Sequence, residues 1–124
     1  MNKKVLVVDD ESPIADMLSL FCQAYGFETK VLTTGSDAVS VVKSYMPDLI
    51  TMDLAMPGTS GLKVIETLKN DEKTRKIPII VISAYAGAGE VSEILKLSSA
   101  VLQKPVKMKD LEKHIENILT SSEN

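Results

Sequence analysis

The stretch Lys4-Val5-Leu6-Val7-Val8-Asp9-Asp10 joins a β-branched apolar run to two consecutive carboxylates. An apolar run of this kind is typical of a strand covered on both faces, as in a parallel sheet. Two further apolar runs end in charge: Leu49–Met52 precedes Asp53, and the weaker Ala100–Gln103 precedes Lys104. Parallel packing of these strands would gather three carboxylates and one ammonium group at one edge. Carboxylates in contact repel by about 4 kcal/mol at an effective dielectric of roughly 20, so the cluster predicts a bound cation.

The length of 124 residues predicts one domain, residues 1–124, with a single core. The formal net charge of −3 gives no electrostatic case for nucleic-acid binding. No signal-peptide pattern and no apolar run long enough to cross a bilayer is present, so we expect no membrane association.

A lone cysteine, Cys22, excludes an internal disulfide and indicates a reducing, cytoplasmic compartment. It falls on the apolar stripe of a predicted helix, so we expect a buried side chain that serves only packing. A local basic run, Lys69, Lys73, Arg75 and Lys76, is interpreted as a solvated loop.

Strand and helix patterns alternate along the chain. Ser12 is predicted to cap the first helix, with Pro13 at its first position and Gly26 at its end. The remaining predicted helices are Ser36–Tyr45, Gly61–Leu68, a weak segment from Ala86 to Leu97, and Lys107–Leu119; the predicted strands are Val5–Val8, Phe27–Leu32, Leu49–Met52, Ile79–Ile82 and Val101–Leu102.

Five strand–helix units with apolar strands predict an α/β fold: a five-stranded parallel sheet with helices on both faces. Of the common doubly wound arrangements, the flavodoxin-like order 2-1-3-4-5 fits this count. Ligands of such sheets bind outside the carboxyl ends of the strands, where the order switches between the first and third. Asp9, Asp10 and Asp53 fall at that point.

Taken together, these motifs resemble the receiver domain of two-component response regulators, in its single-domain, chemotaxis-regulator-like form. The likeness covers essentially the whole chain, and five motifs occur in order. They are Val5–Glu11, Pro47–Asp53, Met56-Pro57-Gly58 with Gly61, Pro78–Ala84, and Lys104-Pro105.

The resemblance implies that Asp53 is the phosphoacceptor, a carboxylate nucleophile toward phosphorus. It implies a Mg²⁺ site formed by Asp9, Asp10, Asp53 and the backbone carbonyl of Ala55, which suits the hard-oxygen preference of this ion.

In the same family, a lysine and a hydroxyl residue contact the phosphoryl oxygens; here these are Lys104 and Ser83. Pro105 is expected to follow Lys104 through a cis peptide bond that aims the lysine.

Three positions that modulate the family's switch are Val101, Tyr85 and Ala55. Val101 replaces an aromatic residue whose ring turns inward on activation, so we expect the signal to leave the site by another route. Tyr85 and Ala55 flank the predicted acyl phosphate; an aromatic shield at Tyr85 and no side chain to orient water at Ala55 predict slow self-dephosphorylation.

The predicted function is that of a stand-alone receiver, a switch that catalyses only its own phosphorylation and dephosphorylation and is otherwise not an enzyme. Its expected partners are a sensor histidine kinase or phosphotransfer protein and a downstream protein, with phosphorylation-dependent homodimerisation left open. An alternative is an interaction module of receiver fold that works without phosphorylation. A flavodoxin or an aspartyl phosphatase of similar winding is disfavoured, because Asp9-Asp10-Glu11 would repel a flavin phosphate and the chain has no spare length for a cap.

Overall fold

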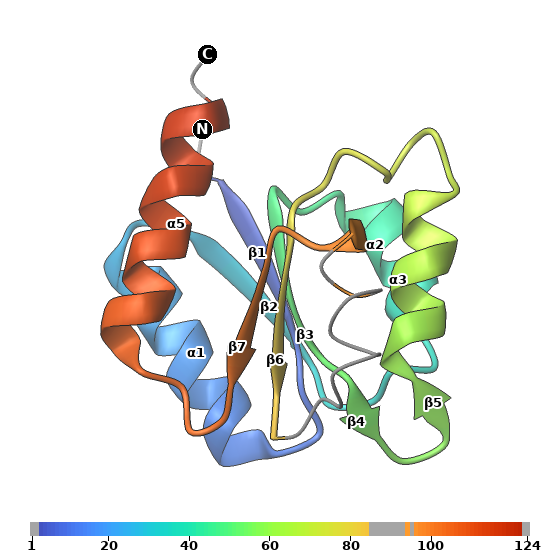
Figure 1. Cartoon of the computed structure of the whole chain (residues 1–124), viewed down its shortest axis with the longest axis horizontal. Coiled ribbons are helices and arrows are strands. Elements are labelled where there is room, and N and C mark those ends of the chain that lie inside the picture. Colours follow the sequence, from blue (N-terminus) through green and yellow to red (C-terminus); the bar gives the residue numbers. More distant parts are fainter. Residues whose placement is uncertain (1–2, 85–93, 95, 123–124) are drawn as a thin grey trace.

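The computed structural model describes residues 3–84, 94 and 96–122, and for residues 119–122 the backbone alone. A central parallel sheet has strands in the order β2-β1-β3-β6-β7, which confirms the predicted 2-1-3-4-5 winding of five main strands (Figure 1). These strands are β1 (Lys4–Val8), β2 (Glu28–Leu32), β3 (Leu49–Asp53), β6 (Ile79–Ser83) and β7 (Ala100–Gln103).

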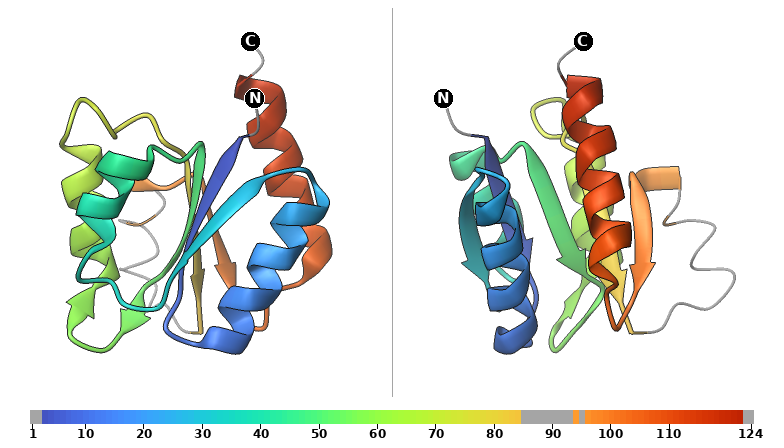
Figure 2. Two further views of the ribbon diagram at one scale, coloured as in Figure 1. Left: turned by 180° about the vertical axis from the view of Figure 1, so that it is seen from behind. Right: turned by 90° about the vertical axis from the view of Figure 1, so that its left-hand side faces the viewer.

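Helices cover both faces of the sheet, as Figure 2 shows from behind and from the side. The helices α1 (Ser12–Ala24) and α5 (Met108–Ser122) lie on one face, and α2 (Ala38–Tyr45) and α3 (Gly61–Lys69) lie on the other. Each face has its own apolar core, because the side chains of a strand alternate between the two faces. No helix in the described ranges is both long and apolar enough to cross a membrane.

The start of α1 differs from the prediction. Glu11, not Ser12, is the N-cap residue, and Ser12 is already helical. The carbonyl of Glu11 accepts hydrogen bonds from the amides of Ile14 and Ala15, at 3.0 and 2.9 Å. Proline therefore stands at the second helical position, where its missing N–H is equally harmless.

Other element boundaries shift slightly. Phe27 is a buried core residue that precedes β2, and α2 begins at Ala38 rather than Ser36. A short antiparallel hairpin, β4 (Ala55–Met56) and β5 (Thr59–Ser60), follows β3 and was not predicted. Most of the weak helix predicted over 86–97 lies outside the described residues, although Ile94 is helical and fully buried.

Gly61, the first residue of α3, permits a close approach to the end of β3. A Cβ atom at this position would lie 2.7 Å from the Cα of Leu54 and 3.0 Å from the carbonyl oxygen of Asp53. Any larger residue would push the helix away from the strand. The glycine of the family-like motif thus has a packing reason, which is to seat α3 directly against the turn that follows Asp53.

Candidate functional site

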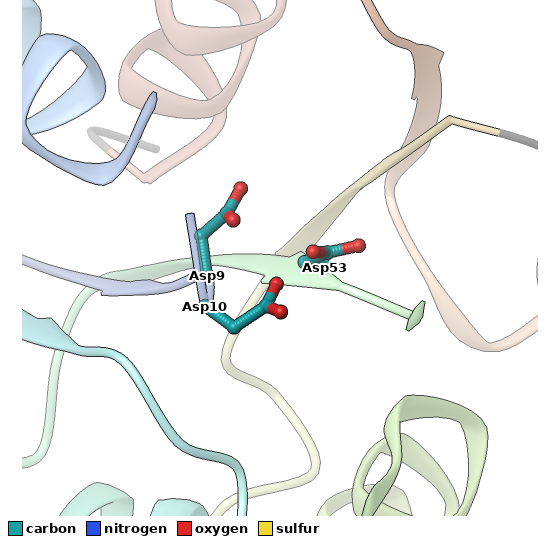
Figure 3. A group of neighbouring side chains, drawn as sticks. All are labelled: Asp9, Asp10 and Asp53. Carbon is teal, nitrogen blue, oxygen red and sulfur yellow. The ribbon is translucent and has the colours of Figure 1, made fainter. Parts of the chain in front are cut away.

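Three aspartates gather at the carboxyl edge of the sheet (Figure 3). Asp9 and Asp10 follow β1, and Asp53 is the last residue of β3. These strands are neighbours with Val8 opposite Met52, so their ends are level. One carboxylate oxygen from each aspartate lies within 4.8 Å of the others. The sequence prediction that the acids meet at the switch point of the sheet is confirmed.

Backbone amides fix the orientation of the two buried carboxylates. The amide of Glu11 donates to Asp9 Oδ1 at 2.9 Å, and the amide of Ala55 donates to Asp53 Oδ1 at 3.1 Å. Asp9 is 1% exposed and Asp53 is 2% exposed. In each residue one oxygen is held by its own turn, which leaves Oδ2 to face the neighbouring charged groups.

Lys104 follows β7 and brings a positive charge to the same point. Its Nζ lies 3.1 Å from Asp9 Oδ2 and 3.2 Å from Asp53 Oδ2, and 3.5 Å from Glu11 Oε1. Its amide donates to the carbonyl of Ser83 at 2.8 Å. The Lys104–Pro105 peptide bond is cis, as predicted. Glu11 belongs to the first motif, but its contact with the lysine was not predicted; the signal for it is its place directly after two acids.

Effects of opposite sign act on the pKa values of Asp53 and Lys104. Burial raises the pKa of Asp53, and the charge of Asp9 raises it further, while the Ala55 amide and Lys104 act to lower it; the net shift is upward. Burial alone would lower the pKa of Lys104, but the carboxylates of Asp9 and Asp53 beside it raise it overall. Lys104 therefore keeps its proton and partly neutralises the acids.

The donor set suits a hard divalent cation. Carboxylate oxygens are the ligands that Mg²⁺ prefers in proteins. Asp9 Oδ2 is buried and, within the described part of the chain, no donor reaches it with hydrogen-bond geometry, although the Lys104 ammonium is close. A buried carboxylate oxygen that accepts no hydrogen bond has lone pairs available to a cation, which makes it a fitting ligand.

The remaining predicted residues occupy separate places. Ser83 is 2% exposed at the end of β6, one residue beyond Ile82, which pairs with Asp53. Ala55 opens β4 with an exposed side chain. Val101 is half-buried, pairs with Val81 and packs against the core beneath α2 and α3. Tyr85 lies outside the described residues.

A model of the response regulator receiver domain matches residues 5–116. The chain belongs to the response regulator receiver family. Receiver domains are phosphoacceptor switches that take phosphoryl groups from histidine kinases, and an acidic cluster at the edge of the sheet accords with that family.

The curated relatives of the chain include response regulators of different lengths. It is 35% identical over 107 residues to the polar-differentiation response regulator DivK of Brucella ovis, covering 86% of this chain and 87% of DivK. It is 34% identical over 114 residues to the DNA-binding response regulator MtrA of Mycolicibacterium paratuberculosis, covering 90% of this chain and 48% of MtrA. The chain thus spans about half the length of the MtrA relatives it matches.

Solved receiver structures share the fold closely. A CheY-like receiver domain protein from Methanospirillum hungatei superposes with a TM-score of 0.91 over 99% of this chain and 98% of its own, at 22% identity. The receiver domain of a DNA-binding response regulator from Colwellia psychrerythraea gives a TM-score of 0.89 at 25% identity, over 96% and 99% of the two chains.

Proposed function

We propose that Asp53 accepts a phosphoryl group from a phosphohistidine of a sensor histidine kinase or phosphotransfer protein, in a Mg²⁺-dependent reaction. The proposal is supported above all by the convergence of three carboxylates and one ammonium group at one edge of the sheet. A protein has no structural reason to bury like charges together, since each must be compensated.

In this proposal Asp53 Oδ2 is the nucleophile, because Oδ1 is held by the Ala55 amide. An Oδ2–P bond forms as the P–N bond to the histidine breaks, and the imidazole nitrogen leaves with the electron pair. Lys104 then exchanges its carboxylate partners for a phosphoryl oxygen, and Ser83 donates its hydroxyl to another. Catalysis of this kind depends on positioning and on neutralising the oxygens.

Asp9, Asp10, Asp53 and the carbonyl of Ala55 would hold the Mg²⁺ ion. When bound, the ion would offset negative charge on the carboxylates and on the transferred group. Because Lys104 Nζ lies within 3.2 Å of both Asp9 and Asp53, the ammonium and the ion would compete for the same oxygens.

The phosphorylated domain, residues 1–124 as one unit, would then control a cytoplasmic protein partner or dimerise. Moving a switch from 1% to 99% active requires about 5.5 kcal/mol. Two or three charge-assisted hydrogen bonds from Lys104 and Ser83, at roughly 1.5–3 kcal/mol each, suffice. Self-modification is the only reaction proposed; Val101 is consistent with an output route that does not use an aromatic rotation.

Incubation with Mg²⁺ and acetyl phosphate, followed by intact mass measurement, tests the proposal. The parent chain is expected to gain one phosphoryl group, Asp53→Asn to gain none, and EDTA to abolish the gain. Asp16→Asn, an exposed aspartate on α1, serves as the matched control and is expected to be modified like the parent. An unmodified parent chain would contradict the proposal and favour the phosphorylation-independent interaction module.

A further inference from the structure

A hollow of about 560 Å³ lies at the amino edge of the sheet, the opposite end from the aspartates. In Figure 1 this is the upper edge, where β1 and β6 begin. Its apolar wall is formed by Phe27, Leu49, Pro78 and Ile118. Its volume is in the range of small-molecule sites, which are mostly apolar with a few polar groups.

A second hollow of about 540 Å³ adjoins the first and is strongly basic. The two share Lys76 and Ser99 as lining residues, so they form one continuous surface. The second hollow contains no acidic residue among those that line it; its lining is Lys69, Arg75, Lys76, Lys96, Leu97, Ser98 and Ser99. Among the residues that the structure describes, no carboxylate forms an ion pair with these four cations, and the acid Asp48 lines the adjoining hollow.

The basic hollow is held in shape by contacts between distant parts of the chain. Lys69 Nζ donates to the carbonyls of Arg75 and Ile77 at 3.0 and 2.8 Å, which fixes the connection between α3 and β6. On the other wall, the amide of Ser99 donates to the carbonyl of Ile79 at 2.8 Å. Lys69 ends α3 and is half-buried, so the prediction of a solvated loop is wrong there, whereas Lys73, Arg75 and Lys76 are exposed.

Lys69 is the half-buried member of the four cations. Burial lowers its pKa, which means that its ammonium form has lost hydration. The two carbonyls use two of its three N–H donors. An anion beside it would restore the missing stabilisation.

We propose that this surface binds a phosphate ester with an apolar body, such as a nucleotide. The phosphate groups lie in the basic hollow, on Lys76 and its cationic neighbours, and the body lies in the adjoining groove against Phe27 and Pro78. His114 and Asn117 line that groove and offer polar contacts to the body. The site is separate from Asp53 and does not depend on phosphorylation there.

Calorimetric titration with ADP and with inorganic pyrophosphate tests this proposal. Both titrations use EDTA, so that no cation bridges the anion to the aspartates, and about 0.15 M salt, which screens exposed charges beyond roughly 8 Å. ADP is expected to bind more tightly than pyrophosphate, because only ADP reaches the apolar groove. Lys76→Ala is expected to weaken ADP binding roughly tenfold, the usual effect of losing one charge-assisted contact.

Lys73→Ala is the matched control, since Lys73 is an exposed lysine of the same loop that does not line either hollow. It is expected to leave ADP binding unchanged, and Lys96→Ala provides a second lining variant should Lys76→Ala fail to fold. Three results would each overturn the proposal: no ADP binding, pyrophosphate binding as tight as ADP, or equal losses in Lys73→Ala and Lys76→Ala. Loss of ADP binding in Asp53→Asn would also overturn it, by placing the anion at the other end.

Discussion

The two ends of the sheet carry charge in opposite ways. At the carboxyl end, Asp9, Asp53 and Lys104 are almost entirely buried and lie within about 3.2 Å of one another in opposite-sign pairs. At the amino end, Lys76 and Lys96 are exposed and line a hollow of one sign. Buried charges require partners at contact distance, whereas exposed charges are stabilised by water. The buried charges of the carboxyl end are therefore coupled to the stability of the fold, whereas the exposed lysines of the amino end contribute little to it.

Replacement of one lysine at each end tests this comparison most strongly. Lys104→Met is expected to lower the free energy of unfolding by about 3 kcal/mol, because two buried carboxylates lose their partner. Lys76→Met, at the exposed end, is expected to change it by less than about 0.5 kcal/mol. Urea unfolding in EDTA measures both.

The same pair of variants also probes the cation site. Saturating Mg²⁺ is expected to restore part of the stability of Lys104→Met, since an ion held by Asp9 and Asp53 replaces the lost positive charge. Mg²⁺ should not alter the stability difference between Lys76→Met and the parent. If the free energy of unfolding fell equally in Lys104→Met and Lys76→Met, burial would not distinguish the two ends of the sheet.

The buried hydroxyl of Thr51 lies between the two ends of the sheet and tests how much burial without a partner costs. Thr51, in the middle of β3, is 1% exposed, and its Oγ1 has no hydrogen-bond partner in the described part of the chain. Thr51→Val is expected to raise the free energy of unfolding by about 1 kcal/mol, because the cost of burying an unpaired hydroxyl disappears. Thermal or urea unfolding measures the change.

Thr74→Val is the matched control for this variant. Thr74 is equally buried, at 1% exposed, but its hydroxyl donates to the carbonyl of Leu68 at 2.6 Å. Its loss is expected to destabilise the chain by about 1–3 kcal/mol, since a buried carbonyl loses its donor. If the free energy of unfolding changed with the same sign in both variants, hydrogen-bond pairing would not decide the cost of burying a hydroxyl.

The smallest effect is expected at Tyr45, near the amino end. Burial raises its pKa from 10.0 to about 12, helped by its hydrogen bond to Glu28 and by the charges of Glu28 and Asp48. The folded chain holds the phenol proton more tightly than the unfolded chain does. The contribution of the protonated phenol to stability is thus fully present below pH 10 and is lost as the pH rises toward about 12.

Tyr45→Phe is accordingly expected to cost about 0.5 kcal/mol at neutral pH, where the 2.9 Å bond to Glu28 is intact. The difference from the parent is expected to vanish between pH 10 and 12. Urea unfolding of both chains across this range measures it. A difference that grew with pH would show that the phenol loses its proton more easily in the folded chain.

The sequence predicted the strands from short-range patterns, and their number limited the sheet order to a few doubly wound arrangements. Apolar strands ending in Asp9-Asp10 and Asp53 must align their carboxyl ends once they pair in parallel. The cis bond before Pro105 was also predicted, from the family resemblance, and is present. The predicted N-cap of α1 was wrong by one residue. Ser12 has the side chain of a typical cap, but the carbonyl of Glu11 accepts the first hydrogen bonds of the helix.

The strands and the acidic cluster could be predicted from the sequence because periodicity and the charges at strand ends are local properties, and the strand order could be predicted because few windings suit five such units. Two arrangements are seen only in the folded chain: Lys104 bridges Asp9 and Asp53, and Lys96 joins a basic run some twenty residues earlier beside an apolar groove. Those contacts unite residues far apart in the chain, and their distances depend on packing between elements. No pattern within a single segment encodes them.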